Sequence, residues 1–374
     1  MSKISRLRIG DYIDTLTDYH ANGSYESLKD NVTLRQEKDY AIMIRTLNFE
    51  RNDFHDDLVY VDKHAYEHLS KSKVYPNDIL TNKIANPGSI YIMPNLDQPV
   101  SCGMNLFLIR FNQKVNQRYM YYCMKNSETY IKSFAHGTST KTITKDEVRD
   151  LLLFMHTDIQ DQNKIENLLT TIDKKIENNI KITRLLLMQA TDIYMHWFFR
   201  KKTNGKISDL LLENDKSHIQ VGEAKASNGD YPFFTSGEAI LEWDEALVDG
   251  RNCFLNTGGN ADVKFYVGKA AYSTDTWSIS AKKDLSDYLY LLLNSIKEEL
   301  NKKFFQGTGL KHLQKELLRE RSIYIPNVAE VKSFNEVVKP MLNMISEKTR
   351  ENQVLSDLRD WLLPMLMNGQ ATVE

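Results

Sequence analysis

Two short segments of this sequence combine glycine, hydroxyl side chains and lysine, which are groups that bind phosphate oxygens. They are residues 136–141 (HGTSTK) and residues 306–311 (QGTGLK). Backbone N–H groups, hydroxyls and ammonium groups are common partners of nucleic-acid phosphates. Both segments suit a structural turn equally well, because glycine favours tight turns and threonine often caps a following helix. The sequence alone leaves both interpretations open.

Signatures of catalytic chemistry are missing from the rest of the sequence. It holds no GxxxxGK[ST] loop, no GxGxxG fingerprint, no GxSxG elbow and no HExxH zinc helix. Asn86, Pro87 and Gly88 come nearest to the Asn-Pro-Pro-aromatic motif of amino-methyltransferases, but lack its second proline and its aromatic residue. His64 and His68 are four residues apart, yet the residues around them do not follow a zinc-helix pattern, so we expect an exposed helix face. The residues offer no catalytic apparatus.

Composition narrows the class of protein further. The 374 residues suggest two or three domains, and 48 basic against 50 acidic residues give a formal net charge of −2. That balance argues against a strongly basic, non-specific nucleic-acid binder, although local basic patches remain possible. Cys102, Cys123 and Cys253 form no CxxC pair, which excludes a disulfide scaffold and fits a reducing cytosol. No apolar run is long enough to span a bilayer, so we expect a soluble cytoplasmic protein.

The chain contains an internal repeat. Residues 136–150 resemble residues 306–320, and Gly137 corresponds to Gly307, so the offset is 170 positions. The identical pairs at this offset are Gly137/Gly307, Thr138/Thr308, Lys141/Lys311, Lys145/Lys315 and Arg149/Arg319. The match continues upstream, where positions 105, 107 and 109 meet positions 275, 277 and 279. We therefore predict two similar domains, each followed by a similar tail.

Both tails have the apolar periodicity of a long helix. Spacings of three and four residues predict one helix from about residue 160 to 199 and another from about 329 to 367. The apolar stripes include Ile165, Leu169, Ile172, Ile176 and Ile180 in the first tail and Val338, Met341, Ile345, Leu355 and Leu362 in the second. Forty residues make a rod of about 60 Å. Pro340 predicts a kink or a restarted helix. Asn179 and Asn352 either set the register of paired helices or face solvent.

The two long helices are the obvious partners for each other's apolar stripes. Antiparallel pairing would place the repeated domains at opposite ends of one rod, related by a pseudo-two-fold axis. The alternative is that each helix packs on its own domain. Strand-like and helix-like runs mix in both globular parts, so we predict an α+β fold with a first domain (1–157), a long helix (158–200), a second domain (201–327) and a second long helix (328–374).

This pattern resembles the specificity subunits of type I restriction–modification systems over essentially the whole chain. The resemblance is carried by the duplicated Gly-Thr-x-x-Lys-x-[Ile/Leu]-x-Lys segments that begin at Gly137 and Gly307. Further matching segments are residues 158–162 (DIQDQ), 172–179 (IDKKIENN), 197–198 (WF), 231–237 (YPFFTSG), 362–364 (LLP) and Gly369. One departure is residues 326–330 (PNVAE), which lack the Glu-Gln that often follows proline there.

The resemblance implies a non-catalytic subunit in which each globular part reads one half of a split, asymmetric target in double-stranded DNA. The long helices would fix the spacing of the halves and dock two methyltransferase subunits. S-adenosylmethionine, ATP and Mg would be bound by partner subunits, including a restriction subunit, and none by this chain; no membrane is involved. One duplex turn is about 34 Å, so a rod of about 60 Å can hold two readers on one face of DNA.

Candidate DNA-binding residues follow from these arguments. For phosphate contacts we expect Thr138, Ser139, Lys141, Thr308 and Lys311. For the base-reading face we expect Lys83, Asn105, Ser236, Asn256 and Tyr272. The alternative function is a coiled-coil interaction adaptor whose paired domains bind protein, which the lack of net positive charge favours.

Overall fold

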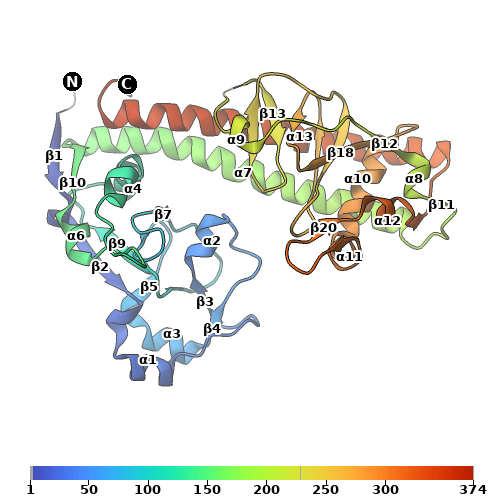
Figure 1. Cartoon of the computed structure of the whole chain (residues 1–374). Coiled ribbons are helices and arrows are strands. Elements are labelled where there is room, and N and C mark those ends of the chain that lie inside the picture. Colours follow the sequence, from blue (N-terminus) through green and yellow to red (C-terminus); the bar gives the residue numbers. More distant parts are fainter. Residues whose placement is uncertain (1–2, 228, 374) are drawn as a thin grey trace. The chain divides into compact units, whose positions relative to one another are not determined.

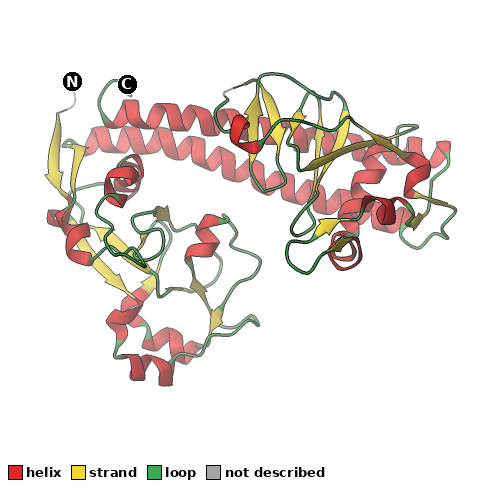
Figure 2. Cartoon of the chain, in the orientation of Figure 1, coloured by secondary structure: helices red, strands yellow, loops and turns green. Residues whose placement is uncertain are grey.

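The computed structural model describes residues 3–227 and 229–373, so positions 1–2, 228 and 374 of the predicted segments lie outside it. The chain divides into two compact units. Unit 1 joins Met1–Asp173 to Asp357–Glu374, and unit 2 is Lys174–Ser356. Helices and strands mix in both units (Figure 2), so the α+β prediction is confirmed.

The described part of unit 1 contains two four-stranded sheets and one two-stranded ladder. The first sheet has the order β2-β9-β6-β7 and is antiparallel throughout, whereas the second has the order β4-β3-β8-β5 and pairs β3 with β8 in parallel. The strands are β1 (Ile4–Arg8), β2 (Ile13–Asp18), β3 (Ala41–Ile44), β4 (Tyr60–Val61), β5 (Lys73–Val74), β6 (Ile79–Asn82), β7 (Ile90–Ile92), β8 (Val100–Cys102), β9 (Leu106–Phe111) and β10 (Leu152–His156). The short helices are α1 (Tyr25–Asn31), α2 (Thr46–Glu50), α3 (Lys63–His68), α4 (Gln117–Asn126), α5 (Glu128–Lys132) and α6 (Lys145–Asp150).

Unit 2 is built on the same plan. Its four-stranded antiparallel sheet has the order β12-β18-β15-β16, and its second sheet, β14-β13-β17, again contains one parallel pair. The strands are β11 (Gly205–Lys206), β12 (Leu211–Glu213), β13 (Tyr231–Phe234), β14 (Ile240–Trp243), β15 (Arg251–Asn256), β16 (Val263–Val267), β17 (Ala271–Tyr272), β18 (Thr276–Ala281), β19 (Phe305–Gln306), β20 (His312–Leu313) and β21 (Ser322–Ile323). The short helices are α8 (Ile207–Leu210), α9 (Val221–Ala224), α10 (Ser286–Ser295), α11 (Lys297–Glu299) and α12 (Lys315–Arg319).

Equivalent backbone hydrogen bonds show that the sequence repeat is a structural repeat. In unit 1 the Lys83 N–H donates to the Asn105 carbonyl at 2.9 Å, and the Ile143 N–H donates to the Lys83 carbonyl at 3.1 Å. In unit 2 Thr257 takes the place of Lys83: its N–H donates to Asp275 at 3.0 Å, and its carbonyl accepts from Leu313 at 3.0 Å. Asn105/Asp275 and Ile143/Leu313 both keep the offset found in the sequence. The predicted duplication is therefore confirmed.

The two long helices are α7 (Ile159–Phe198) and α13 (Val328–Met367). Within each unit they lie side by side (Figure 1). In unit 2, Asn179 bonds to Asn352 and the Trp197 ring lies 5.9 Å from the Phe334 ring. The contacting residues are equally far apart along the two helices, but their order is reversed: Asn179 precedes Trp197 in α7, whereas Phe334 precedes Asn352 in α13. The pairing is therefore antiparallel. In unit 1, Arg359 of α13 forms an ion pair with Asp173 of α7.

The helices also belong to the cores of the globular parts. In unit 1 Ile165 and Leu169 are buried in one cluster with Tyr119 and Tyr122 of α4. In unit 2 Tyr194, Phe198 and Phe334 join the cluster that contains Tyr288 of α10. The apolar stripes are therefore buried against the domains as well as against each other, so both sequence-based alternatives for their partner hold in part.

Two details of the predicted stripes need correction. The Ile180 side chain is 45% exposed and does not face the partner helix. Its neighbour Asn179, which is 3% exposed, occupies the buried position instead. A stripe on a straight helix drifts relative to a strict heptad, which moves the inward position by one residue. In α13, Leu342 is fully buried and Met341 only half-buried, for the same reason. Ile172, Val338 and Ile345 are buried as predicted, and Ile176, Leu355 and Leu362 are half-buried.

The helix restart predicted at Pro340 is wrong, because α13 continues through it. Proline removes one N–H and leaves the carbonyl four residues earlier, that of Glu336, without a helical partner. Glu336 and Pro340 are both exposed, so water can satisfy this carbonyl. Burial of Val338 and Leu342 on the opposite face stabilises the continuous helix.

No helix in the described ranges 3–227 and 229–373 has the length and apolar character needed to cross a bilayer. Cys102, Cys123 and Cys253 are all buried free thiols. Burial raises the pKa of Cys102 and of Cys123 to about 12 in each case. These thiols are therefore inert packing groups.

Candidate nucleic-acid interface

The two glycine-threonine loops are closed by short antiparallel pairing. In unit 1 His136 and Thr142 exchange both backbone hydrogen bonds, at 3.0 and 2.8 Å. In unit 2 β19 pairs with β20, so that Gln306 lies opposite His312. Beyond this closure the loops are exposed, along residues 136–141 in unit 1 and residues 306–312 in unit 2.

Both glycines are required by the loop backbone. Gly137 has a φ of 119° and Gly307 a φ of 150°, which is a region that residues with a side chain rarely adopt. A Cβ at Gly137 would lie 2.4 Å from the Thr140 carbonyl oxygen, and one at Gly307 would lie 2.6 Å from that of Leu310. The repeated glycine therefore serves the turn.

The side chains on these loops are available to a ligand. All five residues expected to contact phosphate are exposed, and their side chains form no hydrogen bond or ion pair with any residue of the described chain. They are Thr138, Ser139, Lys141, Thr308 and Lys311. Thr144, and not a threonine of the loop, caps α6. The loops thus combine a structural glycine with free hydroxyl and ammonium groups, so the two sequence-based interpretations are compatible.

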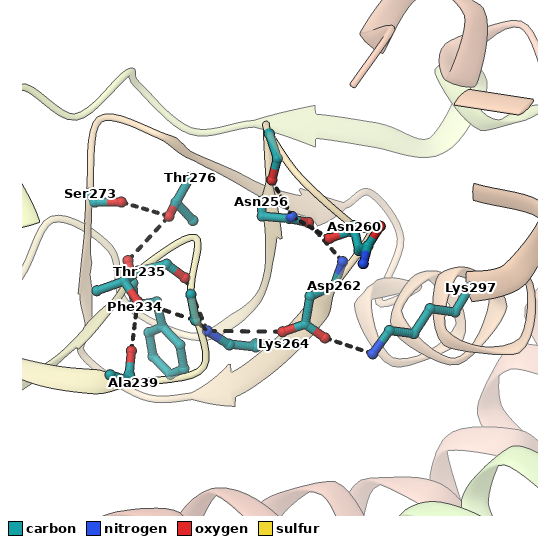
Figure 3. A network of polar contacts seen from close by, with 12 residues as sticks. Phe234, Thr235, Ala239, Asn256, Asn260, Asp262, Lys264, Ser273, Thr276 and Lys297 are labelled. Atoms are coloured by element: carbon teal, nitrogen blue, oxygen red, sulfur yellow. Dashed lines mark hydrogen bonds and ion pairs between the residues drawn. The ribbon is translucent and has the colours of Figure 1, made fainter. Parts of the chain in front are cut away.

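A second loop lies beside the glycine-threonine loop of unit 2. It spans residues 257–262, and its Gly259 N–H donates to the Lys311 carbonyl at 2.9 Å. Asn256 holds it from below (Figure 3): Nδ2 donates to the carbonyls of Gly258 and Asn260 at 2.7 and 2.5 Å, and Oδ1 accepts from Asp262 N–H at 2.7 Å. Asn256 is only 5% exposed. This geometry does not favour the predicted base contact of Asn256, because its side-chain amide is already bonded to the backbone of the loop.

Lys264 fixes a third loop, residues 235–239 between β13 and β14 (Figure 3). Its ammonium donates to the carbonyls of Thr235 and Gly237, and it lies 4.0 Å from Asp262 Oδ2. Thr235 Oγ1 closes the same loop by donating to the Ala239 carbonyl at 2.7 Å. Burial lowers the pKa of Lys264. No sequence pattern marks Lys264 as a loop-holding residue, because a lysine in an alternating strand looks like a solvated side chain.

Two more residues of the predicted reading face are buried. Lys83 forms an ion pair with Asp18 at 2.8 Å, and the Tyr272 hydroxyl donates to the Asp215 carbonyl at 2.5 Å. This geometry does not favour either predicted base contact, because the polar end of each side chain is already bonded inside its unit. Asn105 is exposed and Ser236 half-exposed on the Lys264-held loop, so these two remain available.

The carboxylate of Asp18 binds the ammonium groups of two lysines in unit 1. Lys83 and Lys145 each place Nζ 2.8 Å from one of its carboxylate oxygens. Burial acts to raise the pKa of Asp18, but the hydrogen bonds from Lys145 and Lys83 outweigh it and hold this pKa below its usual value. The carboxylate is thus ionised and neutralises part of the local positive charge.

Among residues 3–227 and 229–373, no group of three or more His, Cys, Asp or Glu side chains is placed to hold a metal ion. His64 Nε2 lies 3.0 Å from Asn31 Oδ1, and His68 lies 3.5 Å from Ser27 Oγ. Both histidines therefore tie α3 to α1.

Comparison with known proteins agrees with this architecture. Residues 200–356 match the family model of the type I restriction modification DNA specificity domain. The chain is 24% identical to a putative type I restriction enzyme specificity subunit (MjaX) of Methanocaldococcus jannaschii, over 93% of this chain and 92% of the relative. It is 21% identical to the MjaIX specificity subunit of the same organism, over 81% and 79% of the two chains.

A solved structure has the same fold. The crystal structure of the type I restriction–modification S subunit from M. genitalium superposes with a TM-score of 0.60 and 14% identity, covering 98% of this chain and 96% of that one. The prediction that the chain is not itself an enzyme agrees with the relatives, each of which is named a specificity subunit. Over most of its length this chain is therefore similar to proteins named specificity subunits of type I restriction–modification systems, and its residues 200–356 match their DNA specificity domain.

Proposed function

We propose that this chain recognises a bipartite, asymmetric sequence in double-stranded DNA, with one half of the target read by each unit. The observation that carries the proposal is the exposed glycine-threonine loop, which equivalent hydrogen bonds build twice on scaffolds whose other loops differ. The repeated loops supply sequence-independent phosphate contacts, through Lys141 in unit 1 and Lys311 in unit 2. The differing loops 235–239 and 257–262 of unit 2, and those of unit 1, read different bases.

The long helices dock methyltransferase subunits in this proposal. Both helices keep apolar side chains exposed on their outer faces, including Leu185 and Met188 of α7 and Val354 of α13. Exposed apolar side chains on a helix are favourable contacts for a second protein. Two methyltransferase subunits carrying S-adenosylmethionine, and a restriction subunit using ATP and Mg, complete the complex in the cytoplasm. This chain itself binds no cofactor.

A salt series tests the proposal. The complex of this chain with its methyltransferase partner is titrated against labelled duplexes at several salt concentrations. DNA recognition predicts a steep negative slope of log affinity against log salt, and a tighter complex with target than with non-target DNA. The Lys141→Ala variant is expected to weaken binding to all duplexes alike. Absence of DNA binding even with the methyltransferase present would instead support the protein-binding adaptor.

A further inference from the structure

One repeated lysine has different bonding partners in the two units. Lys145 begins α6 and Lys315 begins α12 at the offset of the repeat, and each lies over the aromatic residue at the matching strand position. Lys145 Nζ is 5.8 Å from the Phe107 ring centroid, and Lys315 Nζ is 4.8 Å from that of Trp277. The lysine–aromatic pair is thus common to both units.

The carboxylate that accompanies this pair is present only in unit 1. There, buried Asp18 lies opposite Phe107 in the β2–β9 ladder and accepts a hydrogen bond from Lys145 at 2.8 Å. The same carboxylate also binds Lys83. Lys145 therefore has an anionic hydrogen-bonding partner inside the protein, which it shares with Lys83.

In unit 2 the equivalent strand, β12, ends before the position that corresponds to Asp18. β12 ends at Glu213, which lies opposite Ile279, and the Asn214 N–H donates to Ser278 at 3.1 Å. Asp215 therefore reaches the level of Trp277, but its side chain is exposed and forms no ion pair with Lys315.

The nearest other candidate carboxylate is already occupied. Glu213 accepts a hydrogen bond from Trp277 Nε1 at 2.9 Å and forms an ion pair with Arg319. Within the described ranges, Lys315 has a ring beneath its ammonium and no hydrogen-bonding or ionic partner. An aromatic face attracts a cation but cannot accept all three of its protons.

The surroundings of Lys315 add positive charge. Burial lowers the pKa of Lys315 and repulsion from nearby Lys216 lowers it further, whereas attraction to Glu316, which forms an ion pair with Arg319, acts in the opposite direction. Lys315 also lies close in sequence to the exposed loop 306–312, which carries Lys311. A half-buried ammonium without a bonded anion is unfavourable, and an incoming anion would relieve it.

We propose that Lys315, together with Lys216, binds a backbone phosphate of DNA in unit 2, and that Lys145 makes no such contact in unit 1. This assignment rests on the proposed function. Its consequence is that the two units contribute unequally to the sequence-independent part of DNA affinity, although both carry the repeated lysine.

The test compares matched variants in the complex with the methyltransferase partner. Lys315→Gln is expected to reduce the salt slope of DNA binding by about 0.9, the value for one phosphate, and to weaken target and non-target duplexes by the same factor. Lys315→Arg keeps the charge and is expected to keep the slope. Lys145→Gln is expected to leave the slope unchanged while lowering the thermal stability of the chain, because Asp18 loses a partner.

The contradicting results are distinct from failure of the proposed function. A wild-type complex that binds DNA steeply, with the same slope in folded Lys315→Gln, would overturn this assignment alone. An equal loss of slope in Lys145→Gln would also overturn it, as would a Lys315→Gln defect confined to assembly with the methyltransferase. A wild-type complex without DNA affinity would overturn both proposals. Circular dichroism of each variant confirms that it is folded.

Discussion

Asn179 of α7 donates a side-chain hydrogen bond to Asn352 of α13, with 2.9 Å between Nδ2 and Oδ1. The same Nδ2 lies 3.0 Å from Glu351 Oε2, and Asn352 Nδ2 is 3.4 Å from the Ile176 carbonyl. Asn179 is nearly inaccessible to solvent. A buried amide in a helical seam is satisfied in one register only, so this pair fixes how the two helices align. The register-setting interpretation of the two asparagines is the one that the structure supports.

Replacing Asn179 should destabilise the helix pair. Asn179→Ala leaves the oxygens of Asn352 and Glu351 without their buried donor, so we expect the free energy of unfolding to fall by about 1–3 kcal/mol. Urea denaturation of the chain measures this. Asn178→Ala is the matched control, because Asn178 is exposed on the same helix turn and should change little. Equal stability of both variants would contradict a role for Asn179 in the seam.

The repeated loop glycines should resist substitution in both units. Gly137→Ala and Gly307→Ala place a Cβ against a carbonyl oxygen at a positive φ, so each should lose roughly 1–3 kcal/mol of stability. Gly309 lies in the same loop as Gly307 but has open space around its Cα. Gly309→Ala should therefore be tolerated in thermal unfolding. A Gly309 variant as unstable as the Gly307 variant would show that loop flexibility, and not the φ of Gly307, is what matters.

Asn256 should control the order of loop 257–262. Asn256→Ala removes three hydrogen bonds to that loop, so we expect a stability loss of roughly 2–3 kcal/mol and faster amide hydrogen exchange at residues 257–262. Any altered DNA preference of this variant would arise through the loop. Asn260→Ala is the control, because only the backbone carbonyl of Asn260 takes part in the network. Unchanged exchange in the Asn256 variant would refute the assigned role.

Glu351 should make the helix pair sensitive to acid. Hydrogen bonds from Lys175, Lys348 and Asn179 lower the pKa of Glu351 from 4.5 to about 2. A carboxylate with a depressed folded-state pKa contributes stability above its unfolded pKa and loses it as the pH falls through the folded value. The stability advantage of the wild type over Glu351→Gln should therefore be constant above about pH 5 and shrink towards pH 2.

Denaturation of both proteins across this pH range measures the difference. Glu347→Gln is the matched control, because Glu347 is exposed on the same helix and forms no ion pair with described residues. A wild-type advantage that does not vary between pH 5 and pH 2 would mean that Glu351 gains nothing from its neighbours.

The features that the sequence predicted well are periodic or repeated. The stripes of Ile165, Leu169 and Ile172 predicted α7 because a helix must bury one face over its whole length. The duplication predicted equivalent loops because two similar segments with matching glycines fold alike. Only the exact inward positions, such as Asn179 in place of Ile180, needed the structure, because helix drift is smaller than the error of a periodicity estimate.

The reading face could not be predicted in the same way. Lys83, Asn256 and Tyr272 are polar residues in divergent segments, which is what a base-reading residue would be. Each is instead bonded within its unit, to Asp18, to its own loop or to the Asp215 carbonyl. The partner of Lys83 is 65 positions away and that of Lys145 is 127 positions away. No local pattern reveals a bond between residues so far apart in the chain.

Mapping the methylated bases in the genome of a strain that carries this chain and its methyltransferase tests the central claim most directly. Two readers joined in one chain predict a target of two specified parts separated by a spacer of fixed length and free sequence. Exchanging residues 201–327 for the corresponding residues of one of its relatives should then change one part and leave the other part intact. An uninterrupted target, or an exchange that alters both parts together, would contradict the account.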